Sequence, residues 1–274
     1  MAVVYTPRLV ASDVDGTLLD SMERVSERTV RAIARVAQAG TPFILVTGRP
    51  PRWIPPVATA AELNGYAVCA NGAVLYDIGE DRVLLSHLLD PVLLHDVVHA
   101  LEPVVPGISV ATERVPRSLA DRTIAVFTSE SRFSNPWGDE QNRVLPRAEV
   151  LGHGAVKLLI RHEEMTSEEL AEATRAVVGD AVDVTFSTSR GLIEISARGI
   201  TKGTGLAEAA DRLSVDCADA IAFGDMPNDV PMLSWAGHGV AVANAHPEVL
   251  AVADEITGHH TEDGVAQVLE RWFY

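Results

Sequence analysis

The sequence predicts an α/β core, built on a doubly wound parallel sheet, that carries an inserted α+β segment. Three observations support this: short apolar runs without polar alternation, helical patterns between them, and a return of the same rhythm near the end of the chain. Such runs are typical of strands covered on both faces, and their alternation with helices is typical of a parallel sheet. The 274 residues exceed the usual size of one domain, so we expect two domains or one domain with a large insert.

The core is expected in two halves, residues 1–82 and 198–274. Ser26 is placed to cap a helix, and Gly40 suits the exit of that helix. The expected strands are Leu9–Ala11, Phe43–Val46, Ala67–Ala70, Ala220–Phe223 and Gly239–Ala243. The other expected helices are Thr201–Arg212, Val230–Trp235 and Gly264–Trp272.

Residues 83–197 differ from the core, because their strands look amphipathic and the order of elements is less regular. We therefore expect this segment to be an inserted α+β cap domain. Its expected strands are Val156–Arg161, Val182–Ser187 and Leu192–Ser196, and its expected helices are Pro91–Leu101 and Ser167–Val178.

Charge and cysteine content exclude several classes of protein. The chain has 38 acidic and 22 basic residues, a net charge of −16, and a nucleic-acid partner would require a basic face. Cys69 and Cys217 are too few for a disulfide scaffold. The longest charge-free stretch, residues 230–247, contains prolines and glycines and cannot span a membrane. With no apolar signal-peptide core before Asp13, we expect a cytoplasmic protein that binds neither nucleic acid nor membrane.

The motif Asp13-Val14-Asp15-Gly16-Thr17 directly follows the first expected strand, where ligand sites of open parallel sheets lie. Two carboxylates two residues apart suit a two-step phosphoryl transfer: one attacks phosphorus and the other moves the proton. Because two carboxylates would repel each other and the substrate, a divalent cation is needed, and oxygen ligands point to magnesium.

A second acidic cluster, Gly224-Asp225-Met226-Pro227-Asn228-Asp229, follows another buried strand. Asp225 is placed to complete a metal site beside Asp13. Asn228 and Asp229 stand at a helix start, where such residues are also common simply as caps.

Two further candidates lie outside the acidic motifs. Thr47 and Gly48 end the second expected strand and could hold a phosphoryl oxygen, although they could equally be a plain turn. Lys202, opening a helix, could supply positive charge to the phosphoryl group or be a solvated surface lysine. His259 and His260 lack the spacing of a zinc site.

In chain order, four segments resemble the motifs of the haloacid dehalogenase (HAD) superfamily of phosphohydrolases, whose fold is Rossmann-like. The stretch Asn71-Gly72-Ala73 and the long insert resemble its Cof-type branch. One departure is Met226-Pro227, where family members often carry a small polar residue after the Gly-Asp pair. The four segments are Asp13–Leu19, Val46–Arg49, Ile200–Gly203 and Gly224–Asp229.

The resemblance implies a role for each matching residue. Asp13 is the implied nucleophile, which forms an aspartyl-phosphate, and Asp15 the implied general acid and base. The implied phosphate-binding residues are Thr47, Gly48, Lys202 and Asn228. The implied Mg²⁺ ligands are Asp13, the backbone carbonyl of Asp15, Asp225 and Asp229.

An aspartate at position 15 indicates an alcohol leaving group, because a dehalogenase needs no acid there. The expected function is therefore a magnesium-dependent phosphatase of small, sugar-phosphate-like metabolites, acting as a monomer or homodimer. Two alternatives stay open: a hexose phosphomutase of similar fold and a non-catalytic protein that binds phosphorylated metabolites. We expect the insert to select the substrate, and Lys157 and Arg190 could bind sugar hydroxyls or be solvated surface charges.

Overall fold

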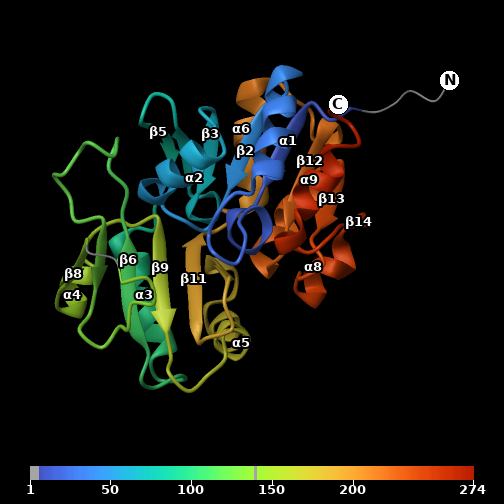
Figure 1. Cartoon of the computed structure of the whole chain (residues 1–274). Coiled ribbons are helices and arrows are strands. Elements are labelled where there is room, and N and C mark those ends of the chain that lie inside the picture. Colours follow the sequence, from blue (N-terminus) through green and yellow to red (C-terminus); the bar gives the residue numbers. More distant parts are fainter. Residues whose placement is uncertain (1–5, 139–140) are drawn as a thin grey trace. The chain divides into compact units, whose positions relative to one another are not determined.

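The computed structural model describes residues 6–138 and 141–274, and it divides the chain into two compact units (Figure 1). The first unit comprises Met1–Arg82 and Thr201–Tyr274, and the second comprises Val83–Ile200. The second unit ends at Ile200 and not at Ala197, the end expected from the sequence. Hydrogen bonds hold this last stretch to the second unit, because the Ile200 amide donates to the Ala197 carbonyl and Ser196 Oγ donates to the Ile200 carbonyl.

An eight-stranded sheet organises the described part of the first unit, and its edge strand begins at Arg82 and runs on into residues assigned to the second unit. In spatial order its strands are β14 (Glu255–Ile256), β13 (His238–Ala241), β12 (Ala220–Gly224), β1 (Leu9–Ser12), β2 (Phe43–Val46), β3 (Tyr66–Cys69), β4 (Val74–Asp77) and β5 (Arg82–Ser86). Strands β14 to β3 pair in parallel, and β4 pairs antiparallel with β3. The predicted parallel core is confirmed, and an antiparallel strand extends it.

Register places the candidate residues at one edge of this sheet. Ser12, the last residue of β1, pairs with Phe223 of β12 and with Leu45 of β2. All three strands run in the same direction, so the residues that follow them meet at the same edge. Strands β1, β2 and β12 are buried along their whole length, as the uninterrupted apolar runs predict.

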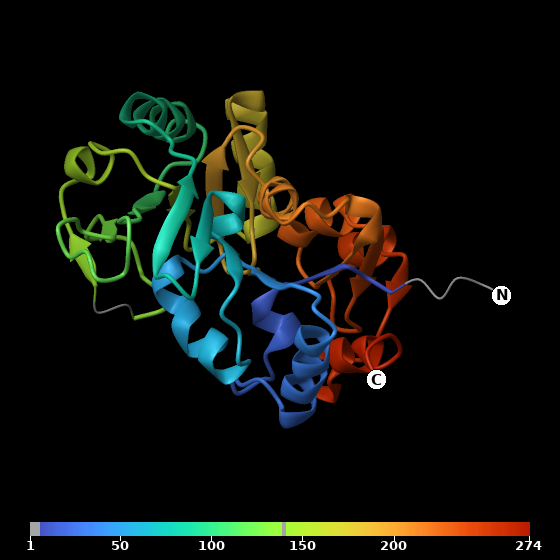
Figure 2. The same cartoon turned by 90° about the horizontal axis from the view of Figure 1, so that it is seen from above.

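Helices cover both faces of the sheet (Figures 1 and 2). The helices of the first unit are α1 (Glu27–Gln38), α2 (Ile54–Ala60), α6 (Lys202–Leu213), α7 (Val230–Trp235), α8 (Pro247–Val252) and α9 (Gly264–Leu269). Helix α1 packs against α9, and α6 packs against α7. Ser26 caps α1 as predicted, because its side chain accepts from the Thr29 amide.

The second unit is built on a six-stranded sheet of its own, mostly antiparallel. In spatial order its strands are β10 (Val182–Thr185), β11 (Leu192–Ala197), β9 (Lys157–Arg161), β6 (Ser109–Glu113), β7 (Phe127–Ser129) and β8 (Asn142–Val144). Its helices are α3 (Pro91–Leu101), α4 (Arg147–Val150) and α5 (Ser167–Val178). This is the α+β composition expected of the insert.

Two residues of the second unit that were candidates for substrate contact have different environments. Lys157 is buried, and its Nζ lies 2.8 Å from Glu194 Oε2, so it is a paired interior charge and not a solvated one. Arg190 is exposed. Across residues 6–138 and 141–274, no helix combines the length and the apolar character that crossing a membrane requires.

Candidate active site

Asp13 directly follows β1 and lies almost wholly buried at the edge where β1, β2 and β12 end. Its backbone amide donates to the Phe223 carbonyl, which ties the start of the loop to β12. Burial raises the pKa of the Asp13 carboxyl well above its ordinary value, the ammonium group of Lys202 opposes that rise, and the nearby carboxylates of Asp229 and Asp225 add to it.

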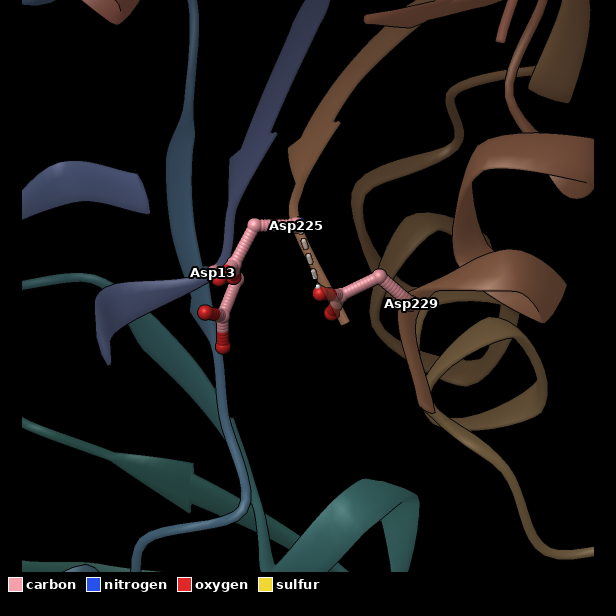
Figure 3. A group of neighbouring side chains, drawn as sticks. All are labelled: Asp13, Asp225 and Asp229. Atoms are coloured by element: carbon pink, nitrogen blue, oxygen red, sulfur yellow. Dashed lines mark hydrogen bonds between the residues drawn. The ribbon is translucent and has the colours of Figure 1, made fainter. Parts of the chain in front are cut away.

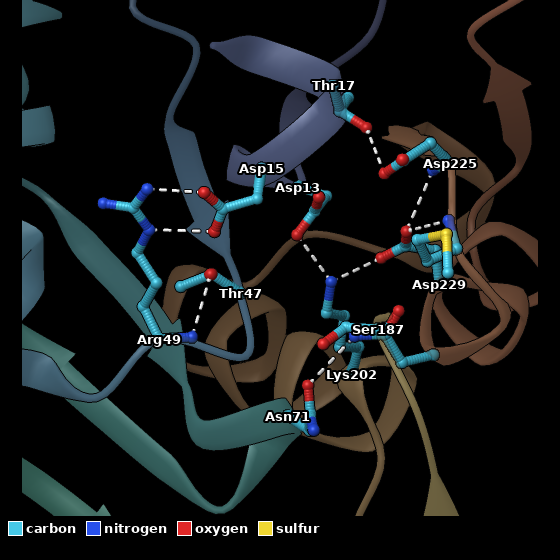
Figure 4. A network of polar contacts seen from close by, with 12 residues as sticks. Asp13, Asp15, Thr17, Thr47, Arg49, Asn71, Ser187, Lys202, Asp225 and Asp229 are labelled. Atoms are coloured by element: carbon cyan, nitrogen blue, oxygen red, sulfur yellow. Dashed lines mark hydrogen bonds and ion pairs between the residues drawn. The ribbon is translucent and has the colours of Figure 1, made fainter. Parts of the chain in front are cut away.

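Lys202 is the first residue of α6 and is also buried. Its Nζ lies 2.6 Å from Asp13 Oδ1 and 2.5 Å from Asp229 Oδ1 (Figure 4). Burial alone would lower the pKa of Lys202, but the two carboxylates outweigh it and the pKa is raised. The lysine is therefore a fixed positive charge inside the acidic group, and the alternative of a solvated surface lysine is wrong.

Three carboxylates meet beside this lysine: those of Asp13, Asp225 and Asp229 (Figure 3). One oxygen from each lies within 4.8 Å of the others. Two hydrogen bonds fix the orientation of the Asp229 carboxylate: its Oδ2 accepts from the backbone amides of Asp225 and Met226, both at 2.9 Å. A Cβ at residue 224 would lie 2.5 Å from Asp229 Cβ, so Gly224 is needed for this approach.

The acidic group fits a divalent cation. Three buried carboxylates face one ammonium group, which leaves an excess of negative charge. Burial, followed by the charge of Asp229, raises the pKa of Asp225 to about 7. A group of oxygen donors with uncompensated negative charge suits a hard cation such as Mg²⁺, and Asp13, Asp225 and Asp229 are the side chains that could hold it.

The raised pKa of Asp225 predicts how stability depends on pH when divalent cations are chelated. Between its ordinary value of 3.8 and about 7, the folded chain binds protons that the unfolded chain releases. This stabilisation is fully present below pH 3.8 and is lost as the pH rises through 7. We expect urea unfolding in chelator to give a free energy that falls across this range, and Asp225→Asn to flatten the fall. An equally steep fall in Asp225→Asn would contradict the assignment.

Asp15 lies in the irregular turn η1 (Val14–Leu18), and its carboxylate does not join the acidic group. Its side chain is 54% exposed, and both its oxygens accept from Arg49, at 2.8 Å from Nε and 2.5 Å from Nη2. Arg49 belongs to the quoted Val46–Arg49 motif, but the sequence did not single it out as a site residue, because its charge does not reveal its partner.

Thr47 and Gly48 follow β2 and so stand at the same edge as Asp13. Thr47 is buried, and it accepts from the Arg49 amide through Oγ1, at 3.0 Å, and from the Asn71 amide through its carbonyl, at 3.1 Å. Gly48 is half-buried. The hydroxyl therefore fixes the turn that carries Arg49.

Asn228 lies in the short turn η6 (Pro227–Asp229), is buried, and donates from Nδ2 to Asn71 Oδ1 at 3.1 Å. Asn71 itself adopts a left-handed backbone, with φ of 58°. Thr17 donates from Oγ1 to Asp225 Oδ1 at 3.0 Å. Asn71 and Thr17 thus extend the polar network (Figure 4). Both lie in segments that resemble the family, although neither residue was predicted to belong to the site.

The comparisons with known proteins agree with this geometry. Residues 10–269 match the family model of haloacid dehalogenase-like hydrolases. An HMP-PP phosphatase of Yersinia pseudotuberculosis is 30% identical over 272 residues, which cover 97% of this chain and 95% of the relative. The pyridoxal phosphate phosphatase YbhA of Escherichia coli is 29% identical over 280 residues, covering 96% of this chain and 98% of YbhA.

Among solved structures, SMU.1108c of Streptococcus mutans has a TM-score of 0.82 at 20% identity, covering 97% of this chain and 99% of that one. This likeness shows the fold. The family model and the relatives confirm the resemblance inferred from the four motifs. The chain thus belongs to the haloacid dehalogenase-like hydrolases, in their Cof-type branch, and is a phosphoric monoester hydrolase.

Proposed function

We propose that this enzyme hydrolyses monoesters of small phosphorylated metabolites with the help of Mg²⁺, through an aspartyl-phosphate on Asp13. The observation that carries the proposal is the contact between the Lys202 ammonium group and the Asp13 carboxylate, 2.6 Å apart in the interior. A buried lysine aimed at a carboxylate provides the positive charge that an incoming phosphoryl group requires.

In the first step, an oxygen of Asp13 attacks phosphorus and the bond from phosphorus to the alcohol oxygen breaks. Lys202 lies beside the attacking carboxylate and offsets the negative charge of the phosphoryl oxygens. Thr47 and Gly48, at the end of the neighbouring strand, are proposed to bind the same oxygens, together with Asn228.

Asp15 is proposed to carry the proton. As the bond to the alcohol breaks, Asp15 protonates the leaving oxygen; it then takes a proton from the water that attacks the aspartyl-phosphate, releasing phosphate and restoring Asp13. Both oxygens of Asp15 accept from Arg49, so we propose that Asp15 leaves Arg49 to reach the leaving oxygen.

Asp13, Asp225, Asp229 and the backbone carbonyl of Asp15 are the groups proposed to hold Mg²⁺. The bound cation would neutralise charge on the carboxylates and on the phosphoryl oxygens.

The substrate is proposed to be a small phosphorylated metabolite, because relatives of nearly equal length are named as phosphatases of HMP-PP and of pyridoxal phosphate. The proposed roles in the first unit concern only the phosphoryl group, the leaving oxygen and the cation, which every phosphate ester shares. We therefore propose that the second unit selects among metabolites.

Removal of divalent cations is expected to abolish activity, because the three carboxylates would otherwise oppose an anionic substrate. The measurement is hydrolysis of nitrophenyl phosphate in excess chelator, followed by addition of magnesium, which should restore the rate. Undiminished hydrolysis in chelator would overturn the metal assignment. A panel of phosphorylated metabolites assayed with magnesium for released phosphate would then identify the substrate, and isomerisation of a hexose phosphate without release would indicate the phosphomutase instead.

A further inference from the structure

Asn244, in the loop between β13 and α8, uses both ends of its amide to join two distant segments. Its Nδ2 donates to the Gly16 carbonyl at 2.8 Å, and its Oδ1 accepts from the His260 amide at 3.0 Å. The first contact reaches the turn that carries Asp15, and the second reaches the short turn η7 (His260–Glu262). One half-buried side chain therefore fixes the turn η1 to the C-terminal part of the first unit.

His260 adds a second attachment to the same turn. Its Nδ1 lies 2.7 Å from the Leu19 carbonyl, which can only accept, so Nδ1 donates. Asn244 and His260 thus bind carbonyl groups on both sides of the segment Thr17–Leu18.

The Asn244 loop also contacts the acidic group. The His246 amide donates to the Asp225 carbonyl at 2.7 Å, and Thr17 Oγ1 donates to the Asp225 carboxylate. The loop that holds Gly16 therefore also holds the backbone of a proposed metal ligand, and the relative placement of Asp15 and Asp225 depends on it.

Asp15 needs such support from the backbone. Its side chain is 54% exposed, and its two bonds from Arg49 must break before it donates the proton, so neither packing nor Arg49 holds it at that step. The residue after it is a glycine with φ of 77°. Glycine has more conformational freedom than any other residue, and a contact to its backbone from another segment reduces that freedom. The bond from Asn244 to the Gly16 carbonyl is such a contact.

We propose that Asn244, supported by His260, is a positioning residue for the general acid Asp15. This inference rests on the proposed function, because it assumes that Asp15 protonates the leaving alcohol. An acid displaced by about 1 Å loses on the order of 10²-fold in rate. In the first step the loss falls on substrates whose leaving group needs the proton, and kcat/KM reports this step alone. The later hydrolysis of the aspartyl-phosphate, which Asp15 assists equally for every substrate, contributes only to kcat.

The test compares two substrates that differ in their need for an acid. Nitrophenyl phosphate has a leaving group stable without a proton, whereas an alkyl phosphate does not. Asn244→Leu, which removes both bonds, should lower kcat/KM for the alkyl phosphate about 10- to 100-fold and change kcat/KM for nitrophenyl phosphate little. Asn244→Asp keeps an acceptor for the His260 amide and loses the donor to Gly16, so the same pattern is expected even if Asn244→Leu folds poorly.

Thr257→Val is the matched control. Thr257 Oγ1 donates to the Gly264 carbonyl at 2.8 Å, which is the same kind of bond in the same part of the chain, with both partners outside η1. Thr257→Val should lower the melting temperature, and any change in kcat/KM should be the same for the alkyl phosphate and for nitrophenyl phosphate. Equal losses of kcat/KM on both substrates in the Asn244 variants would show a merely structural role and overturn the inference. A wild-type enzyme inactive on both substrates would overturn the proposed function, and the inference with it.

Discussion

Asp13→Asn is expected to lower kcat on the order of 10⁴- to 10⁶-fold, as deletion of a nucleophile does in other hydrolases. The amide keeps the size of the side chain but cannot attack phosphorus. Since burial disfavours the charged carboxylate of Asp13, the neutral amide should not destabilise the fold, and the melting temperature in chelator should stay equal or rise. The measurements are kcat for nitrophenyl phosphate and thermal unfolding.

Asp96→Asn makes the same chemical change at an exposed position of α3 and should alter neither quantity. Rapid acid quenching of the wild-type enzyme during turnover should trap an acyl-phosphate on Asp13. Mapping of the trapped phosphate to another residue would refute the assignment, and so would an Asp13→Asn variant with a near-normal kcat.

Lys202→Met is expected to remove both activity and stability. The methionine fills most of the space but leaves Asp13 and Asp229 without the ammonium group that each contacts. Removal of one partner from a buried ion pair costs roughly 3–5 kcal/mol, because the remaining charge stays buried and uncompensated. Activity should fall with it, since the phosphoryl oxygens lose their positive neighbour.

A double variant separates the two losses. Lys202→Met with Asp229→Asn removes one carboxylate together with the ammonium group, so part of the unfolding free energy should return, while activity should not. Urea unfolding of the four forms in chelator gives the coupling energy. If the two single changes simply add in free energy, Lys202 and Asp229 are not coupled in the interior and the electrostatic account of the site is wrong.

The sequence predicted the core of the first unit well, for a physical reason. A strand buried on both faces shows an uninterrupted apolar run, and β2 and α7 begin and end at the expected residues. In the second unit, the helices α3 and α5 also have the expected bounds. The polar residues after such strands must lie at one sheet edge, which is why Asp13 and Asp225 could be expected to meet.

The sequence predicted the strands of the second unit less completely, because polar residues lie inside its sheet. Strand β6 is buried throughout, although it carries Ser109, Thr112 and Glu113, so its sequence does not resemble a buried strand. Thr112 is accommodated by a hydrogen bond of 2.8 Å to Thr128, a partner that no local pattern reveals. Strands β6 and β7 were accordingly not predicted, and neither was β8, which is short and largely exposed.

The same limit applies to the candidate site. Residue type and spacing indicated which groups carry charge, but not the partner that each one takes. The pairing of Asp15 with Arg49, and of Asn244 with Gly16, depends on contacts between segments far apart in the chain. Spacing within a motif contains no information about such contacts.

The order of strands in the first sheet has a consequence for how the enzyme is made. Strand β1 lies between β2 and β12. Arg8, the residue before β1, forms an ion pair with Asp219, which precedes β12 and lies 211 residues further along the chain. During synthesis β1 can pair on one side early, while its other edge waits until almost the whole chain has left the ribosome. So late a pairing predicts slow folding, with an open strand edge that a chaperone could protect from aggregation. The nucleophile and its acidic partners are therefore assembled only in the last stage of folding, and a nascent chain that ends before Asp229 has no complete site.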